Sequence, residues 1–111
     1  MTDFKNISPD ELKQLLENKD AEKFILVDAR DEEEFEKEHL PNAINIDKYN
    51  FLDFAETTPK EKTLIIYCRS GRRSQRMAQK LIRKGFMSVY NLLGGFNAWI
   101  ESGYSCIFPQ S

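Results

Sequence analysis

Two short apolar runs without polar alternation constrain the fold of this chain most strongly. Phe24–Val27 is closed by Asp28, and Leu64–Tyr67 leads directly into Cys68. A strand with one exposed face alternates apolar and polar residues, whereas a strand covered on both faces reads as a continuous apolar run. The two runs therefore predict parallel strands that are buried between layers of helices.

Signals for helices separate these strands. Ser8 fits an N-cap, with Pro9 at the first helical position and Glu11 in a capping box, and Ile7 is placed to pack against Leu12. We expect helices near residues 8–16, 31–38, 51–56, 73–84 and 96–101, and further strands at 44–46 and 89–92. This alternation predicts an α/β fold, with a central parallel β-sheet flanked by helices on both faces. We expect a single domain over residues 1–111, with a core at about 7–103 and a short tail at 104–111.

Composition narrows the class of protein. The chain has 111 residues and a formal net charge of -2, which argues against a nucleic-acid partner. Its longest apolar run is too short to cross a membrane, and its first residues lack the apolar core of a secretory signal, so we expect a cytoplasmic protein. Two cysteines and one histidine exclude a disulfide-stapled scaffold and imply neither a metal nor a cofactor.

The loop after the second apolar run concentrates positive charge around a thiol. Its residues are Cys68, Arg69, Ser70, Gly71, Arg72, Arg73 and Ser74. We expect the loop to lie at the carboxyl end of a strand, with a helix that begins near Arg73 or Ser74. A helix N-terminus presents unpaired N–H groups, and Gly71 lets successive amides point inward as a nest for an anion. The pattern predicts a nucleophilic Cys68 whose pKa is lowered.

Several readings of this loop remain open on the residues alone. An inert, buried Cys68 among solvated arginines is the plainest alternative, but the placement of the thiol argues against it. A reactive cysteine in an anion cradle serves either phosphoryl transfer or sulfur transfer. These two chemistries need cradles of different size, and the length of the loop sets that size.

Four motifs in a fixed order resemble the single-domain rhodanese family of sulfurtransferases. The matching segments are Asp28-Ala29-Arg30, Glu34-Phe35 followed by His39–Ile46, Cys68–Ser74, and Gly94–Trp99. Glu38 and Asn42 stand where the family usually has glycine, and asparagine tolerates a positive φ better than most residues. The resemblance implies the rhodanese-like fold over nearly the whole chain.

The same resemblance addresses the choice of chemistry. Related phosphatases of this fold carry a loop with five residues between cysteine and arginine, whereas only four separate Cys68 from Arg73. The resemblance thus implies the smaller, sulfur-sized cradle, with Cys68 as catalytic nucleophile and residues 69–74 binding the substrate and the persulfide. It implies a small anionic sulfur donor, such as thiosulfate or polysulfide, and a thiol or protein acceptor. A persulfide carrier for a specific protein partner and a phosphatase or arsenate reductase remain as alternatives.

The other notable residues are interpreted as scaffold. Asp28 and Arg30 organise local structure or line the pocket, and Arg30 is placed to pair with Glu34 at i, i+4. His39 is a structural turn residue and Trp99 packs in the core. Cys106 lies in the tail and is a bystander rather than a resolving partner for Cys68.

Overall fold

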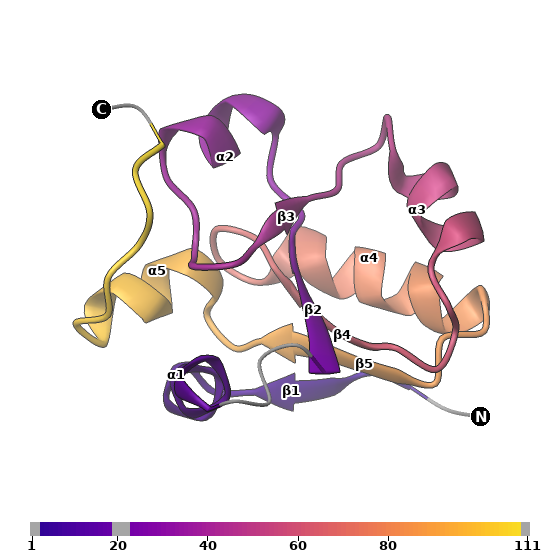
Figure 1. Cartoon of the computed structure of the whole chain (residues 1–111), viewed down its shortest axis with the longest axis horizontal. Helices are drawn as coiled ribbons and strands as arrows, with labels where there is room; N and C mark the ends of the chain where they lie inside the picture. Colours follow the sequence, from indigo (N-terminus) through magenta and orange to yellow (C-terminus); the bar gives the residue numbers. More distant parts are fainter. Residues whose placement is uncertain (1–2, 19–22, 110–111) are drawn as a thin grey trace.

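A parallel sheet forms the centre of the described structure (Figure 1). The computed structural model describes residues 3–18 and 23–109, so the ends of the expected domain at 1–2 and 110–111 lie outside the described residues. The described strands are β1 (Lys5–Ile7), β2 (Phe24–Asp28), β3 (Ile44–Asn45), β4 (Thr63–Tyr67) and β5 (Ser88–Leu92). They lie in the order β1-β5-β4-β2-β3, and each neighbouring pair is parallel, which confirms the predicted sheet.

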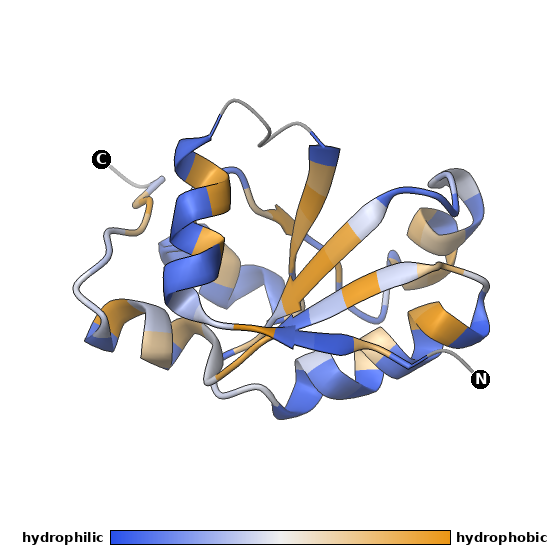
Figure 2. Cartoon of the chain, turned by 90° about the horizontal axis from the view of Figure 1, so that it is seen from below, coloured by the Kyte–Doolittle hydropathy of each residue, from blue (hydrophilic) through white to orange (hydrophobic). Residues whose placement is uncertain are grey.

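Helices cover both faces of this sheet. The described helices are α1 (Pro9–Glu17), α2 (Glu32–Lys37), α3 (Phe51–Thr57), α4 (Arg72–Arg83) and α5 (Gly95–Glu101). Alternate residues of β4 belong to two separate apolar clusters, because successive side chains of a strand point to opposite faces. Ile66 belongs to the same cluster as Leu81 of α4. Ile65 belongs to the other cluster, with Leu12 of α1 and Trp99 of α5. In Figure 2 the central strands are mostly hydrophobic, and the helices carry hydrophilic stripes.

The N-terminal boundary of α1 follows the predicted capping box. The Ser8 hydroxyl accepts a hydrogen bond from the Glu11 N–H at 3.1 Å, and the Ser8 N–H donates to the Glu11 carboxylate at 2.9 Å. Pro9 occupies the first turn, where its missing N–H leaves no intrahelical bond unmade. These bonds satisfy backbone groups that the helix itself cannot pair, so the predicted start is confirmed.

Strand β1 is not predicted from the sequence, which indicates only a contact of Ile7 with Leu12. Lys5 and Asn6 are exposed and Ile7 is buried, so this segment has no recognisable apolar run. The strand pairs along one edge of the sheet with β5, where Ile7 lies opposite Leu92. Its place comes from a long-range pairing rather than from a local pattern.

The two departures from the family pattern are accommodated differently. Asn42 adopts a φ of 67°, the left-handed conformation in which glycine is usual and asparagine is tolerated. Glu38 has a φ of -165°, which is extended backbone that any residue adopts. The turn between α2 and β3 therefore needs glycine at neither position.

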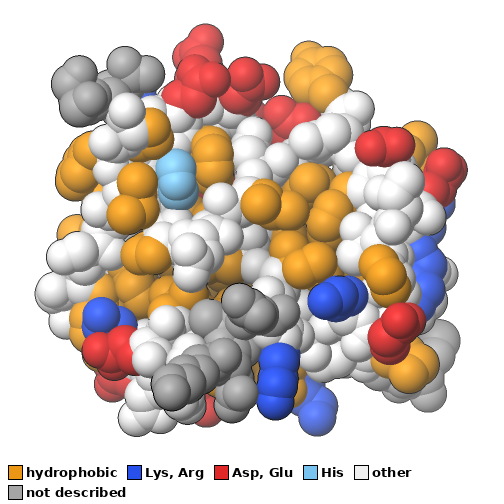
Figure 3. Space-filling model, in the orientation of Figure 1, with side chains coloured by type: hydrophobic (Ala, Val, Ile, Leu, Met, Phe, Trp, Pro, Cys, Tyr) orange, Lys and Arg blue, Asp and Glu red, His pale blue; other side chains and the backbone are white. Residues whose placement is uncertain are grey.

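In Figure 3 acidic side chains gather along the upper edge of the surface, and hydrophobic side chains lie across its middle. Toward the lower edge, basic and acidic side chains lie together. Among the residues described, no helix is both long and apolar enough to cross a membrane.

Candidate active site

Cys68 lies at the carboxyl end of β4, where the chain turns into α4. Its side chain is only 2% exposed and belongs to the apolar cluster on the α4 face of the sheet. Gly71 is the residue before the helix and has a φ of 106°, a conformation that a residue with a Cβ rarely adopts. Helix α4 begins at Arg72, one residue before the earliest predicted start, so its N-terminus faces the thiol.

Hydrogen-bond donors converge on the sulfur of Cys68. The Gly71 N–H donates to Sγ at 3.0 Å, and the Ser74 hydroxyl oxygen lies 3.4 Å from Sγ. Burial raises the pKa of the Cys68 thiol. Hydrogen bonds from the Ser74 hydroxyl and from the N–H groups of Ser74, Gly71 and Ser70 outweigh burial and hold this pKa below its ordinary value. The donors stabilise the thiolate because they favour negative charge at the sulfur.

The N-terminus of α5 fixes the outer side of the loop. The N–H of Phe96 donates to the Cys68 carbonyl at 2.8 Å, and the N–H of Asn97 donates to the Arg69 carbonyl at 3.0 Å. A Cβ added to Gly95 would lie 2.4 Å from the Cys68 carbonyl oxygen and 2.8 Å from that of Arg69. Only glycine at position 95 permits this approach. The loop carbonyls therefore point toward α5, while loop N–H groups face the sulfur.

The loop arginines are not equivalent. Arg69 and Arg73 both contact the Glu34 carboxylate of α2, at 2.9 and 3.3 Å, and Arg73 also lies 3.8 Å from Asp31. The side chains of Arg69 and Arg73 remain about half exposed. Arg72 is exposed, and no acidic side chain in the described part of the chain forms an ion pair with it. Burial raises the pKa of Glu34, but the hydrogen bonds from Arg69 and Arg73 prevail and lower it.

The predicted pairing of Arg30 with Glu34 is wrong. Arg30 precedes α2 and is fully buried. Its Nε donates to Oδ1 of Asp28 at 3.1 Å, and its Nη2 donates to Oδ2 at 2.8 Å. Burial disfavours the charged form of the guanidinium and so lowers the pKa of Arg30. The hydrogen bonds to Asp28 and its negative charge outweigh this effect and raise the pKa above its ordinary value. Phe96 covers the guanidinium, with its ring centre 4.5 Å from Cζ.

Tyr67 connects this buried ion pair to strand β4, which leads into Cys68. Its hydroxyl donates to Asp28 at 2.6 Å and accepts from the Leu40 N–H at 3.1 Å. Burial, together with the negative charge of Asp28, raises the pKa of Tyr67 far above its ordinary value, so the hydroxyl stays protonated. Since Tyr67 immediately precedes Cys68, the network fixes the backbone from which the loop departs.

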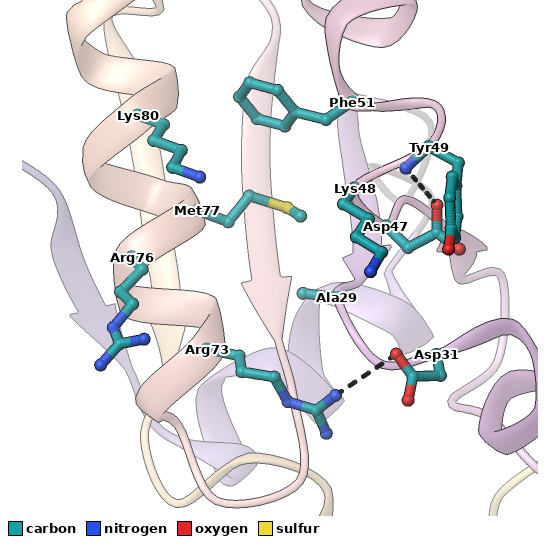
Figure 4. Close-up of a pocket in the computed structure, with 10 residues that line it drawn as sticks. All are labelled: Ala29, Asp31, Asp47, Lys48, Tyr49, Phe51, Arg73, Arg76, Met77 and Lys80. Atoms are coloured by element: carbon teal, nitrogen blue, oxygen red, sulfur yellow. Dashed lines mark hydrogen bonds and ion pairs between the residues drawn. The ribbon is translucent and has the colours of Figure 1, made fainter.

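A groove of about 360 Å³ lies along α4 beside the loop (Figure 4). Met77 and Phe51 extend toward each other across it, and Arg73 reaches Asp31 at one end. Ala29 is part of its lining, whereas Cys68 is not. Arg73 thus takes part in both the loop and the groove.

The remaining candidates lie away from the sulfur. His39 stacks on Phe35 with ring centres 3.9 Å apart, and its Nδ1 is 3.0 Å from the Phe35 carbonyl oxygen. Trp99 is buried and donates from Nε1 to the Ser105 carbonyl. Cys106 is half-buried and forms no disulfide.

Two residues near the site were not identified from the sequence. The sequence predicts Glu34 as part of a motif and as a partner of Arg30, but not as a partner of Arg69 and Arg73. Its acidic charge is the signal that could have suggested this contact with the loop arginines. Asn91 lies within the last predicted strand, and the sequence predicts no role for it. Its side chain is 1% exposed, and its Oδ1 lies 2.6 Å from the Ser74 hydroxyl oxygen. An amide among the apolar residues of a buried strand is the signal that could have revealed it.

Comparison with known proteins agrees with this geometry. The family model for the rhodanese-like domain matches residues 8–102. The chain is 36% identical to the thiosulfate sulfurtransferase GlpE of Coxiella burnetii (strain RSA 331 / Henzerling II), with 86% of this chain and 87% of that protein covered. It is 36% identical to GlpE of Shewanella oneidensis, with 92% and 98% covered. A crystal structure of a rhodanese-like domain protein from Staphylococcus aureus has a TM-score of 0.75 and 33% identity, covering 86% and 91%. The chain therefore belongs to the rhodanese-like domain family.

Proposed function

We propose that this chain is a thiosulfate sulfurtransferase that carries sulfur as a persulfide on Cys68. The convergence of the Gly71 N–H and the Ser74 hydroxyl on Sγ is the observation that carries the proposal. A buried thiol that is surrounded by donors, with its pKa lowered, is suited to act as a nucleophile without a neighbouring base. The name of the GlpE relatives, thiosulfate sulfurtransferase, supports the same reaction.

The first half of the reaction loads the enzyme. The Cys68 thiolate attacks the outer sulfur of thiosulfate, a new S–S bond forms, and the S–S bond of thiosulfate breaks. Sulfite leaves with the electron pair of the broken bond. The product is a Cys68 persulfide, whose outer sulfur takes up the negative charge and is held by N–H groups of residues 70–74.

The second half returns the enzyme to its starting state. A thiophilic acceptor attacks the outer sulfur of the persulfide, and the bond to Sγ breaks with its electron pair returning to the Cys68 thiolate. Cyanide serves as the acceptor in an assay and leaves as thiocyanate, whereas a thiol or a protein thiol serves in a cell. The charges of Arg69, Arg72 and Arg73 assist the approach of anionic donors. The reaction needs no metal or organic cofactor.

Transfer of sulfur from thiosulfate to cyanide tests the proposal. Cys68→Ser keeps nearly the same size but loses the acidic thiol, so we expect it to abolish transfer while the circular dichroism spectrum stays unchanged. Cys106→Ser is the matched control and should retain nearly full activity. Substantial transfer by Cys68→Ser would contradict the proposal. Hydrolysis of p-nitrophenyl phosphate at a comparable rate, abolished by Cys68→Ser, would favour a phosphatase instead.

A further inference from the structure

The hydroxyl of Ser74 lies between two groups that can each accept its proton. Its oxygen is 2.6 Å from Oδ1 of Asn91 and 3.4 Å from Sγ of Cys68. All three side chains are buried, at 2% exposure or less. A hydroxyl carries a single proton, so it cannot donate to both neighbours at once. The direction in which it points must therefore follow the charge on the sulfur.

The uncharged thiol favours one direction along this chain of groups. The thiol S–H donates to the Ser74 oxygen, and the Ser74 hydroxyl donates to Oδ1 of Asn91. The short 2.6 Å distance between the two oxygens fits this second bond. Asn91 acts here as an acceptor.

An anionic sulfur requires the opposite direction. The Ser74 hydroxyl then donates to the sulfur, and its oxygen would face Oδ1 of Asn91 with no proton between them. Turning the amide over places the Nδ2 group there, and its N–H donates to the Ser74 oxygen. The two ends of an amide have nearly the same shape, so the reversal needs no additional space.

The fold holds Asn91 where it can make both arrangements. It lies on β5 opposite Ile66 of β4, two residues before Cys68. Its amide is beside the loop, because a Cβ added to Gly71 would lie 3.9 Å from Nδ2. Helix α4 thus contributes the hydroxyl that contacts the sulfur, and strand β5 contributes the amide that contacts this hydroxyl.

We propose that Asn91 is a positioning residue whose amide reverses with the charge state of Cys68 and thereby directs the Ser74 hydroxyl. The same reversal serves the persulfide anion of the loaded enzyme, and this part of the inference rests on the proposed function. The thiol and thiolate forms do not depend on sulfur transfer, so the experiment uses them alone. The inference about Asn91 can therefore fail while the proposed function stands, and the proposed function can fail while the inference stands.

The test measures the pKa of Cys68 in a Cys106→Ser background, where a single thiol titrates. The alkylation rate with iodoacetamide is followed against pH. Asn91→Leu removes both the donor and the acceptor, and we expect it to raise the pKa by about 0.5 to 1, the scale of one hydrogen bond. If Asn91 were a fixed acceptor that competes for the Ser74 proton, the same change would lower the pKa. A fall or no change would overturn the proposal.

A double-mutant cycle separates the relay from a general structural effect. With Ser74→Ala already present, Asn91→Leu should leave the pKa unchanged, because the group through which Asn91 acts is gone. An equal shift in both backgrounds would contradict the relay. The ionised carboxylate of Asn91→Asp only accepts hydrogen bonds, so this variant should raise the pKa more in the presence of Ser74 than in the Ser74→Ala background. This comparison cancels the effect of the added charge.

The reversal of the amide can also be observed without changing Asn91. In the Cys106→Ser protein, the NMR signals of the Asn91 side-chain NH₂ should shift with pH at the midpoint of Cys68 titration. The shift should vanish in the additional presence of Cys68→Ser. Signals that stay constant through the titration of Cys68 would overturn the proposal.

Discussion

Glu34 of α2 and Arg69 of the loop form an ion pair of 2.9 Å, although they lie 35 residues apart in the sequence. Arg73 approaches the other oxygen of the same carboxylate at 3.3 Å. One acidic residue thus holds two of the loop arginines and offsets part of their positive charge. In the proposed function, an anionic donor competes with Glu34 for these guanidinium groups.

Removing the charge of Glu34 should therefore improve the binding of thiosulfate. We expect Glu34→Gln to lower KM for thiosulfate about two- to five-fold at low ionic strength, the effect of one partly exposed charge. Screening should diminish the effect at high salt. Steady-state kinetics at two salt concentrations measure it. Glu36→Gln makes the same charge change at an exposed position of α2 and should change KM less. Equal effects of the two variants would place Glu34 outside the path of the donor.

The buried ion pair of Asp28 and Arg30 should matter for stability. Arg30→Met leaves the Asp28 carboxylate buried with no cation beside it, which costs about 3–5 kcal/mol of the free energy of unfolding. Urea denaturation followed by circular dichroism measures this loss. Lys13→Met removes one partner of the exposed Lys13–Glu17 pair at 3.7 Å, and should cost less than about 1 kcal/mol. Similar losses in both variants would contradict the role assigned to burial.

Much of the fold could be predicted because its signals are local. Strands β2 and β4 are continuous apolar runs, and the start of α1 is specified by Ser8 and Glu11 within a few residues. Strand β1 could not be predicted, since its short and largely exposed sequence becomes a strand only when β5 lies beside it.

In the candidate site, too, local features could be predicted and long-range contacts could not. The loop around Cys68 was predictable because its residues are contiguous. The partners of its side chains were not, because they come from other elements. Arg30 was assigned to Glu34 on helical spacing, but α2 begins only at Glu32, and Asp28 is the residue beside Arg30 at the buried end of β2. The sequence likewise does not indicate that Asn91 of β5 contacts Ser74 of α4.

Gly95 should be required for the shape of the loop rather than for the chemistry itself. Gly95→Ala places a Cβ against the carbonyl oxygens of Cys68 and Arg69 and strains a φ of 60°. We expect a loss of at least about 1 kcal/mol in stability and a fall in kcat for sulfur transfer. Gly103→Ala is a suitable control, since its φ is also positive but no atom lies within 4 Å of the added Cβ. If Gly103→Ala lowered kcat as much as Gly95→Ala, close packing against the loop would not be the cause.

The lowered pKa of Cys68 predicts a specific pH dependence. The thiolate is present above this pKa and is lost as the pH falls through it. In the Cys106→Ser protein, the alkylation rate should rise with pH and reach a plateau, with a midpoint below the ordinary cysteine value of about 8.5. Ser74→Ala should move the midpoint upward, because it removes the hydroxyl that favours the anion. A midpoint at or above the ordinary value would contradict the cradle as an anion site.

Intact mass spectrometry after incubation with thiosulfate tests the central claim most directly, because it detects the persulfide itself. The unmodified sequence and Cys106→Ser should each gain the mass of one sulfur atom, and cyanide should remove it. Cys68→Ser should gain nothing. A stable gain on Cys68→Ser, or no gain on the unmodified sequence, would contradict a Cys68 persulfide as the carrier of the transferred sulfur.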